Sequence, residues 1–138
     1  MICRLCPRDC GAERTETKRG GVCGMPSVPV AARAMLHQWE EPCLVGENGA
    51  GTVFFSGCNL RCCFCQNKPI SQGGAGKTVT VERLREIFHE LIEQGAACLD
   101  LVTPTHFTDA VLEALGDELW PVPVVWNSGG YEKPETLR

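Results

Sequence analysis

The sequence contains no apolar run that approaches the roughly 20 residues of a membrane-spanning helix, so no membrane partner is expected. It also lacks an excess of basic residues. The formal net charge is −4, which gives no electrostatic reason to expect a nucleic-acid partner. No apolar core with a small-residue cleavage site follows Met1, so no signal peptide is expected. These absences predict a cytoplasmic protein that acts on a small molecule or on another protein.

The length of 138 residues suits one domain with a buried core. It excludes a complete eight-unit β/α barrel, which needs about 200 residues or more. Any barrel in this chain is therefore expected to be partial.

Ten cysteines are present, and in a reducing compartment clustered cysteines indicate metal binding more often than disulfides. Cys58, Cys62 and Cys65 follow the apolar run 53–55 with the spacing C-x3-C-x2-C. Thiolates are soft ligands that select zinc or iron–sulfur clusters. A structural zinc site requires four ligands, whereas a cluster with three protein ligands leaves one iron open. The spacing therefore favours a cluster that can bind a further molecule.

Cys63 interrupts this motif and could act as a fourth ligand, which would make the cluster a structural or electron-transfer centre. We expect it not to do so, because the adjacent side chains of Cys62 and Cys63 point in different directions.

The order Cys58-x3-Cys62-x-Phe64-Cys65 resembles the cluster motif of the radical S-adenosylmethionine superfamily. Residues 54–67, together with 103–106, are similar to the pyruvate formate-lyase activating enzyme-like proteins. The resemblance implies a [4Fe–4S] cluster whose fourth iron binds S-adenosylmethionine. It further implies reductive cleavage of that molecule to a 5′-deoxyadenosyl radical, which abstracts hydrogen from a glycyl-radical enzyme or a small molecule. A flavodoxin or ferredoxin is the implied one-electron donor.

The resemblance also implies where the cofactor lies. Phe64 is expected to shield the cluster, and polar groups at the ends of the following strands are expected to contact S-adenosylmethionine. His106 is the one residue of this set that titrates near neutral pH, although no protein base is needed for the first step. The candidate cofactor contacts are Asn59, Phe64, Thr103, Thr105, His106, Asn127, Ser128 and Gly129.

A second group of cysteines, in the segment 1–27, has the number of thiols that a closed tetrahedral site requires. These residues are Cys3, Cys6, Cys10 and Cys23. We expect a second metal site there, holding zinc or an iron–sulfur cluster. A segment with so few apolar residues cannot build a core of its own, so a bound metal is needed to stabilise its fold. The alternative is a mobile arm with unligated cysteines.

Strands are expected at 52–56, 98–102 and 122–126. Thr80 is expected to cap a helix with one apolar stripe, formed by Val81, Leu84, Ile87, Phe88, Leu91 and Ile92. Thr108 and Asp109 are expected to cap a second helix, with Val111, Leu112, Leu115 and Leu119 on its apolar stripe. This alternation predicts a parallel sheet. Residues 30–36 are either a strand or a helical turn. His37, Trp39, Glu40 and Glu41 precede the first expected strand, and we expect them in a surface turn.

The expected fold is thus α/β, a partial TIM-like radical S-adenosylmethionine barrel of about three βα units. It comprises residues 28–138, and the Cys-rich metal-binding segment 1–27 precedes it. Half a barrel leaves an open sheet with an exposed edge and an apolar face, and we expect self-association or a second chain to cover it. We also expect the chain to be a part of a longer enzyme. The alternative function is a non-catalytic, metal-linked binding module or an inactive fragment.

Overall fold

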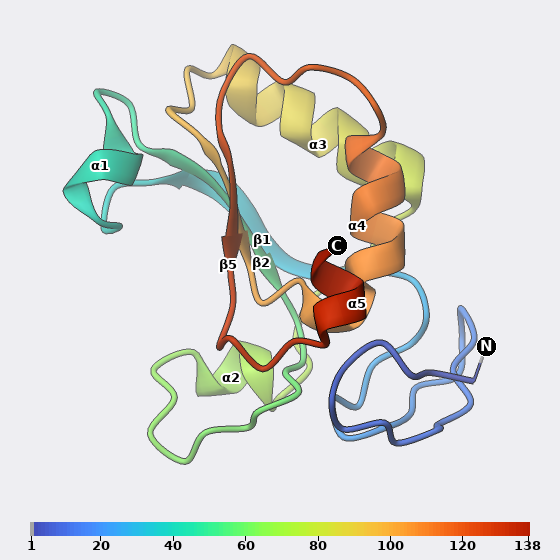
Figure 1. The fold of residues 1–138 in the computed structure, drawn as a ribbon. Coiled ribbons are helices and arrows are strands. Elements are labelled where there is room, and N and C mark those ends of the chain that lie inside the picture. The colour runs from blue at the N-terminus through green and yellow to red at the C-terminus, as the bar shows by residue number, and fades with distance from the viewer. Residues whose placement is uncertain (1) are drawn as a thin grey trace.

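The computed structural model describes residues 2–138 and contains a five-stranded sheet with the strand order β3-β1-β2-β4-β5 (Figure 1). The strands are β1 (Val30–His37), β2 (Ala50–Phe55), β3 (Lys77–Thr78), β4 (Leu99–Val102) and β5 (Val124–Asn127). The helices are α1 (Pro42–Val45), α2 (Lys68–Ser71), α3 (Val81–Glu93), α4 (Thr108–Leu115) and α5 (Pro134–Leu137), with a 3-10 helix η1 (Thr105–Phe107). The predicted α/β class is confirmed, and the sheet is open.

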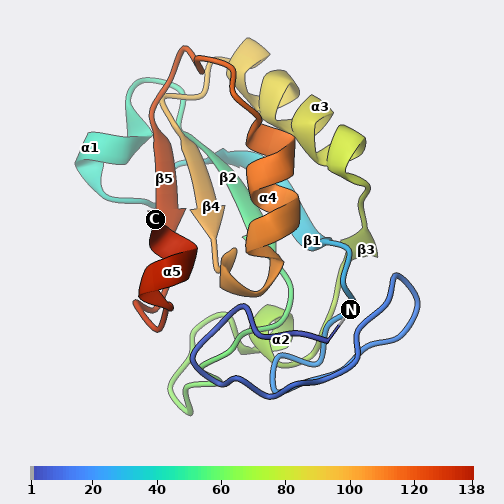
Figure 2. The ribbon, with the colours of Figure 1, turned by 45° about the vertical axis from the view of Figure 1, so that its right-hand side comes forward.

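Strands β2, β4 and β5 form the parallel part of the sheet that the sequence predicts. Helix α3 connects β2 to β4, and α4 connects β4 to β5. Both helices lie on the same side of the sheet, as two views show (Figures 1 and 2). The carboxyl ends of the three strands therefore meet at one edge, from which the cysteine loop after β2 leaves.

Strand β1, whose residues the sequence left open as a strand or a helical turn, lies outside the parallel part of the sheet. Residues 30–37 form a strand that pairs antiparallel with β2 and with the short β3. The connection from β1 to β2 comprises residues 38–49, which contain only the four-residue helix α1. The link contains no helix long enough to cross the sheet, which parallel neighbours usually require, so it suits an antiparallel pair.

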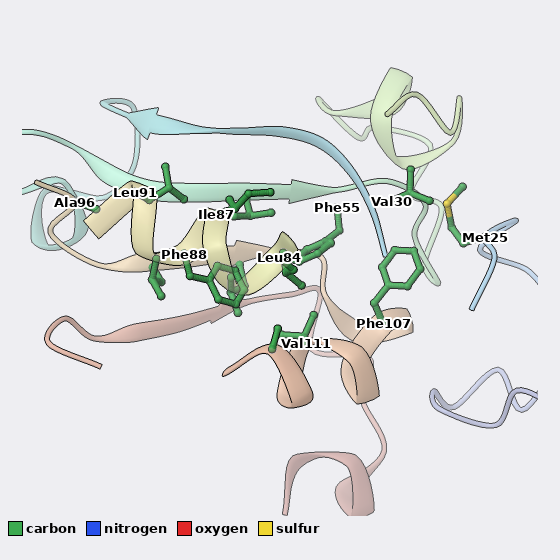
Figure 3. Close-up of a cluster of buried hydrophobic side chains, with 14 of the residues drawn as sticks. Met25, Val30, Phe55, Leu84, Ile87, Phe88, Leu91, Ala96, Phe107 and Val111 are labelled. Atoms are coloured by element: carbon green, nitrogen blue, oxygen red, sulfur yellow. The ribbon is translucent and has the colours of Figure 1, made fainter. Parts of the chain in front are cut away.

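The core lies between the sheet and α3 and α4 (Figure 3). The α3 stripe predicted from helical spacing is confirmed: Leu84, Ile87, Phe88 and Leu91 are buried against the sheet. Thr80 caps this helix as predicted, with its hydroxyl oxygen accepting a hydrogen bond from the Arg83 amide at 3.1 Å. Side chains of β2 and β4 alternate, so Val53, Phe55, Leu99 and Leu101 complete the core.

Helix α4 begins differently from its prediction. Thr108 does not cap it, because its hydroxyl donates to the Thr105 carbonyl at 2.8 Å inside η1. The helix ends at Leu115, and Leu119, which was expected on its buried stripe, is 98% exposed.

The segment before β1 has no helix and only isolated β-bridges, yet it packs on the domain. Met25 joins the core beside Val30 and Phe107 (Figure 3). Figure 2 places the segment beneath the sheet, at the same end as α2. Across residues 2–138, no helix has the length and apolar character required to span a membrane.

Candidate metal and cofactor site

The cysteine loop begins at Gly57, directly after β2. Gly57 has a φ of 81°, and a Cβ atom there would come within 2.9 Å of the Cys23 carbonyl oxygen and also collide with Met25. Only glycine combines this left-handed backbone with such close packing. The loop is therefore turned sharply out of the strand and held against the N-terminal segment.

The three motif cysteines differ from Cys63 in their surroundings. Cys58, Cys62 and Cys65 are half-buried, whereas Cys63 is exposed. The Leu60 amide donates to the Cys58 sulfur at 3.4 Å, and the Cys65 sulfur lies 3.4 Å from the Ser71 hydroxyl. Hydrogen bonds of this kind stabilise thiolates at cluster sites.

Within residues 2–138, no three Cys, His, Asp or Glu side chains are arranged ready to coordinate an ion. The fit to a cluster therefore rests on the donors themselves. They are three soft thiols on one loop that contains no carboxylate, which suits an iron–sulfur cluster.

A cavity of about 410 Å³ adjoins the residues that follow Cys65. Phe54, Val102 and Asn127 form its floor, as cross-strand neighbours in one row on the sheet face opposite α3. The lining residues are His37, Trp39, Glu40, Phe54, Gln66, Asn67, Val102 and Asn127. The lining contains no Lys or Arg and includes the carboxylate of Glu40, so the cavity suits a ligand with positive charge.

Acidic groups concentrate on this face. The His37 Nδ1 lies 2.8 Å from a Glu40 carboxylate oxygen, and the His37 ring packs edge-on against Phe54. Asp100 is fully buried two residues before Val102, on the same side of β4. Burial and the nearby charge of Glu40 raise the pKa of Asp100 to about 6.

The expectation that His37, Trp39, Glu40 and Glu41 lie in a surface turn is correct for Trp39, which is 89% exposed, and Glu41 is exposed as well. It is wrong for His37 and Glu40, whose side chains are largely buried and line the cavity. The sequence carried no clear signal for this, because residues 30–37 show no two-residue alternation that would identify them as a strand.

Of the three residues at the end of β5 that were predicted to contact S-adenosylmethionine, one lines the cavity. Asn127 lines it, and its amide lies 3.5 Å from a carboxylate oxygen of Asp100. Ser128 accepts a hydrogen bond from the Gly130 amide instead. Gly129 packs so tightly on Leu60 that a Cβ there would collide with it. The β5 end therefore contacts the cysteine loop directly.

Two further predicted contacts on the cysteine loop lie outside the cavity lining. Asn59 is buried, and its amide donates to the Tyr131 carbonyl at 2.9 Å. Phe64 is 85% exposed, so shielding of a cluster by its ring stays a prediction.

Thr103 and Thr105, at the end of β4, are also engaged by the fold. Thr103 has a φ of 59°, and its amide donates to the Asn127 carbonyl at 2.7 Å. The Thr105 hydroxyl donates to Glu132 at 2.6 Å. Their predicted contacts with S-adenosylmethionine stay predictions.

His106 does not titrate near neutral pH, in contrast to the expectation from its residue type. The ring is buried, with Nε2 2.6 Å from the Ser56 carbonyl oxygen, and burial lowers the pKa of His106 to about 4. The fold therefore favours a neutral His106 at neutral pH. The ring lines a second, smaller cavity together with the N-terminal cysteines.

The structure brings Cys3, Cys6, Cys10 and Cys23 around that second cavity. All but Cys10 are buried. Burial raises the pKa of the Cys23 thiol, and the Arg14 guanidinium opposes this rise. The segment packs on the domain, with Met25, Cys3, Cys6 and Cys23 buried, and metal binding by its cysteines stays a prediction.

Comparisons with known proteins were informative for the central part of the chain. A family described as "4Fe-4S single cluster domain" matches residues 45–116, just over half of the chain and including the cysteine loop. The N-terminal cysteines lie outside this match.

An uncharacterized protein of Methanocaldococcus jannaschii is 33% identical over 137 residues, covering 94% of this chain and 39% of the relative. The chain thus spans well under half of that relative's length. No solved structure matches the chain significantly.

Proposed function

The chain belongs to the 4Fe-4S single cluster domain family, and from this membership we propose that it is a radical S-adenosylmethionine protein. In this proposal Cys58, Cys62 and Cys65 hold one [4Fe–4S] cluster, and S-adenosylmethionine binds the fourth iron. One observation carries the choice of ligands: three cysteines of the loop are half-buried, whereas Cys63 is exposed.

The cluster, when bound, supplies one electron for reductive cleavage of S-adenosylmethionine. The chain's own residues bind and orient that molecule. Gln66, Asn67 and Asn127 present amide groups to the 410 Å³ cavity beside the cysteine loop, and Glu40 presents a carboxylate. Carboxylate and amide oxygens accept hydrogen bonds from an ammonium group, and the lining contains no Lys or Arg that would repel it.

The hydrogen donor and the electron donor are proposed by class. A glycyl-radical enzyme or a small molecule supplies the hydrogen atom, and a flavodoxin or ferredoxin reduces the cluster. Phe54, Val102 and Asn127 are only half-buried on the cavity face of the sheet. We propose that this face is covered by further strands of a partial barrel, in a longer protein or a second chain, which would also carry substrate contacts.

Metal analysis after anaerobic reconstitution with iron and sulfide tests the ligand assignment. The unchanged chain should bind about four irons and four sulfides and show broad thiolate-to-iron charge-transfer absorption. Cys58→Ser, Cys62→Ser and Cys65→Ser should each lose most of this iron.

Cys63→Ser is the matched control, since it removes a thiol from the same loop, and it should retain the cluster. Loss of the cluster in Cys63→Ser, with retention in any one of the three motif variants, would overturn the assignment.

A further inference from the structure

A second group of thiols lies outside both the family match and the cluster loop. Cys3, Cys6, Cys10 and Cys23 line one small cavity, with Arg14 and His106 in the same wall. All four cysteines are free thiols, and three of them are buried. Four thiols are the donor set of a closed tetrahedral metal site. Within residues 2–138 no three such side chains are already at coordination distance of one another, so binding an ion here requires the thiols to move closer together.

The size of the space selects the kind of metal centre. The cavity measures about 10 Å³, which is close to the volume of one water-sized sphere. A single ion fits such a space, whereas a [4Fe–4S] cluster, with eight inorganic atoms, would require the four thiols to move much further apart. No carboxylate lines the cavity, so its donors are soft and suit Zn²⁺ rather than Mg²⁺ or Ca²⁺.

The charge of such a site is partly balanced by Arg14. Four thiols lose their protons when they bind Zn²⁺, which leaves a net charge of −2 on the centre. The Arg14 guanidinium is 1% exposed, and its Nη1 lies 3.1 Å from the Cys3 sulfur. Its other donors bond the carbonyls of Pro26 and His106, which fixes the cation beside the thiols. A buried cation held at this place favours thiolates over thiols.

Two further features match an occupied site. Gly21 has a φ of 75°, and a Cβ there would come within 3.0 Å of the Cys10 sulfur, so glycine lets the backbone close around the thiols. His106 Nε2 faces the Ser56 carbonyl, which can only accept, so the proton is on Nε2 and the lone pair is on Nδ1. Nδ1 is buried and has no hydrogen-bond partner within residues 2–138. A buried acceptor without a partner is rare unless a bound species satisfies it.

We propose that Cys3, Cys6, Cys10 and Cys23 bind a single Zn²⁺ ion as thiolates, with Arg14 as the counter-charge. The ion links distant parts of the N-terminal segment to one another, and that segment contacts the cluster loop. Arg8 Nε donates to the Asn59 carbonyl at 2.7 Å, and Arg61 donates to the Val22 carbonyl at 3.2 Å across this contact. The zinc site thereby supports the loop that carries Cys58.

Zinc, iron and sulfide content of the full chain, purified without oxygen and without added zinc, tests the proposal. The unchanged chain should carry about one zinc. The triple variant Cys58→Ser/Cys62→Ser/Cys65→Ser should keep that zinc while it loses iron, which separates this site from the proposed cluster. The double variant Cys6→Ser/Cys23→Ser should lose the zinc, and Cys43→Ser, an exposed cysteine elsewhere, should retain it.

Because the double variant can fail to fold, the unchanged chain provides a second readout. Stripped of zinc and titrated with Co²⁺, it should show the visible bands of a tetrahedral cobalt–thiolate centre, which Zn²⁺ then abolishes. Iron and sulfide in place of zinc at these residues would overturn the proposal. Loss of zinc in His106→Gln with retention in Cys10→Ser would overturn the four-thiolate assignment.

Discussion

Among single residues, the carboxyl group of Asp100 is an unusual component of the cavity face. It is fully buried, and one of its oxygens has no hydrogen-bond partner within the described residues. Its pKa of about 6 lies above the ordinary value of 3.8, because burial and the charge of Glu40 disfavour the ionised form. A buried carboxyl group that destabilises the fold in this way is typical of a binding face, where a bound cation would pair with the carboxylate.

The pH dependence of stability follows from this shift. Below the ordinary pKa both the folded and the unfolded chain hold the Asp100 proton. Between about pH 4 and 6 the unfolded chain releases it first, so stability falls as pH rises through this window. Asp100→Asn should therefore stabilise the chain by about 2 kcal/mol more at pH 7 than at pH 4. Urea unfolding at the two pH values measures the difference.

Glu93→Gln is the control for this prediction, since it removes an exposed carboxylate from α3, away from the cavity. It should shift stability by less than about 0.5 kcal/mol at both pH values. An Asp100→Asn variant that is equally stabilised, or destabilised, at pH 4 and pH 7 would contradict the pKa that we assign to Asp100.

At the scale of elements, the turn from β2 into the cysteine loop determines where the three thiols lie. Gly57 takes a left-handed conformation there, and the Cys23 carbonyl oxygen occupies the space that a side chain would need. Gly130 also has a positive φ, of 73°, but nothing lies within 4 Å of its Cβ position. The two glycines therefore separate the cost of backbone strain from the cost of a collision.

Gly130→Ala should cost about 1 kcal/mol of folding free energy, which is the strain of a left-handed alanine. Gly57→Ala should cost at least about 2 kcal/mol more, because the collision with the N-terminal segment adds to the same strain. It should also lower the iron that the reconstituted chain retains. Urea unfolding and iron analysis of the two variants provide the comparison. Equal losses of stability would show that the loop does not pack on the segment as described.

At the scale of the whole molecule, the sequence allows prediction of those features that depend on interactions between residues close together in the chain. The stripe of Leu84, Phe88 and Leu91 and the cap at Thr80 could be predicted, because their partners lie within one helix and its neighbouring strands. The buried His106 could not, since its ring bonds the Ser56 carbonyl fifty residues earlier. The antiparallel β1 was left open for the same reason, because the sheet edge that it pairs with is set by tertiary contacts.

The site shows the same division. The spacing of Cys58, Cys62 and Cys65 predicts a cluster loop, because all three ligands belong to one short stretch. The contributions of His37 and Glu40 to the adjoining cavity depend on the antiparallel pairing of β1 with β2, which brings the His37 ring against Phe54. Residues 30–36 fit either a strand or a helical turn from the sequence alone, so these two cavity residues could not be placed from it.

The central claim is that three thiolates hold a cluster with one open iron, which S-adenosylmethionine occupies. Electron paramagnetic resonance of the reconstituted, chemically reduced chain, recorded with and without S-adenosylmethionine, tests it most directly. We predict that the spectrum of the reduced cluster changes on addition of S-adenosylmethionine, and that Cys63→Ser behaves in the same way. An unchanged spectrum at saturating S-adenosylmethionine would contradict the claim and identify a cluster closed by protein ligands.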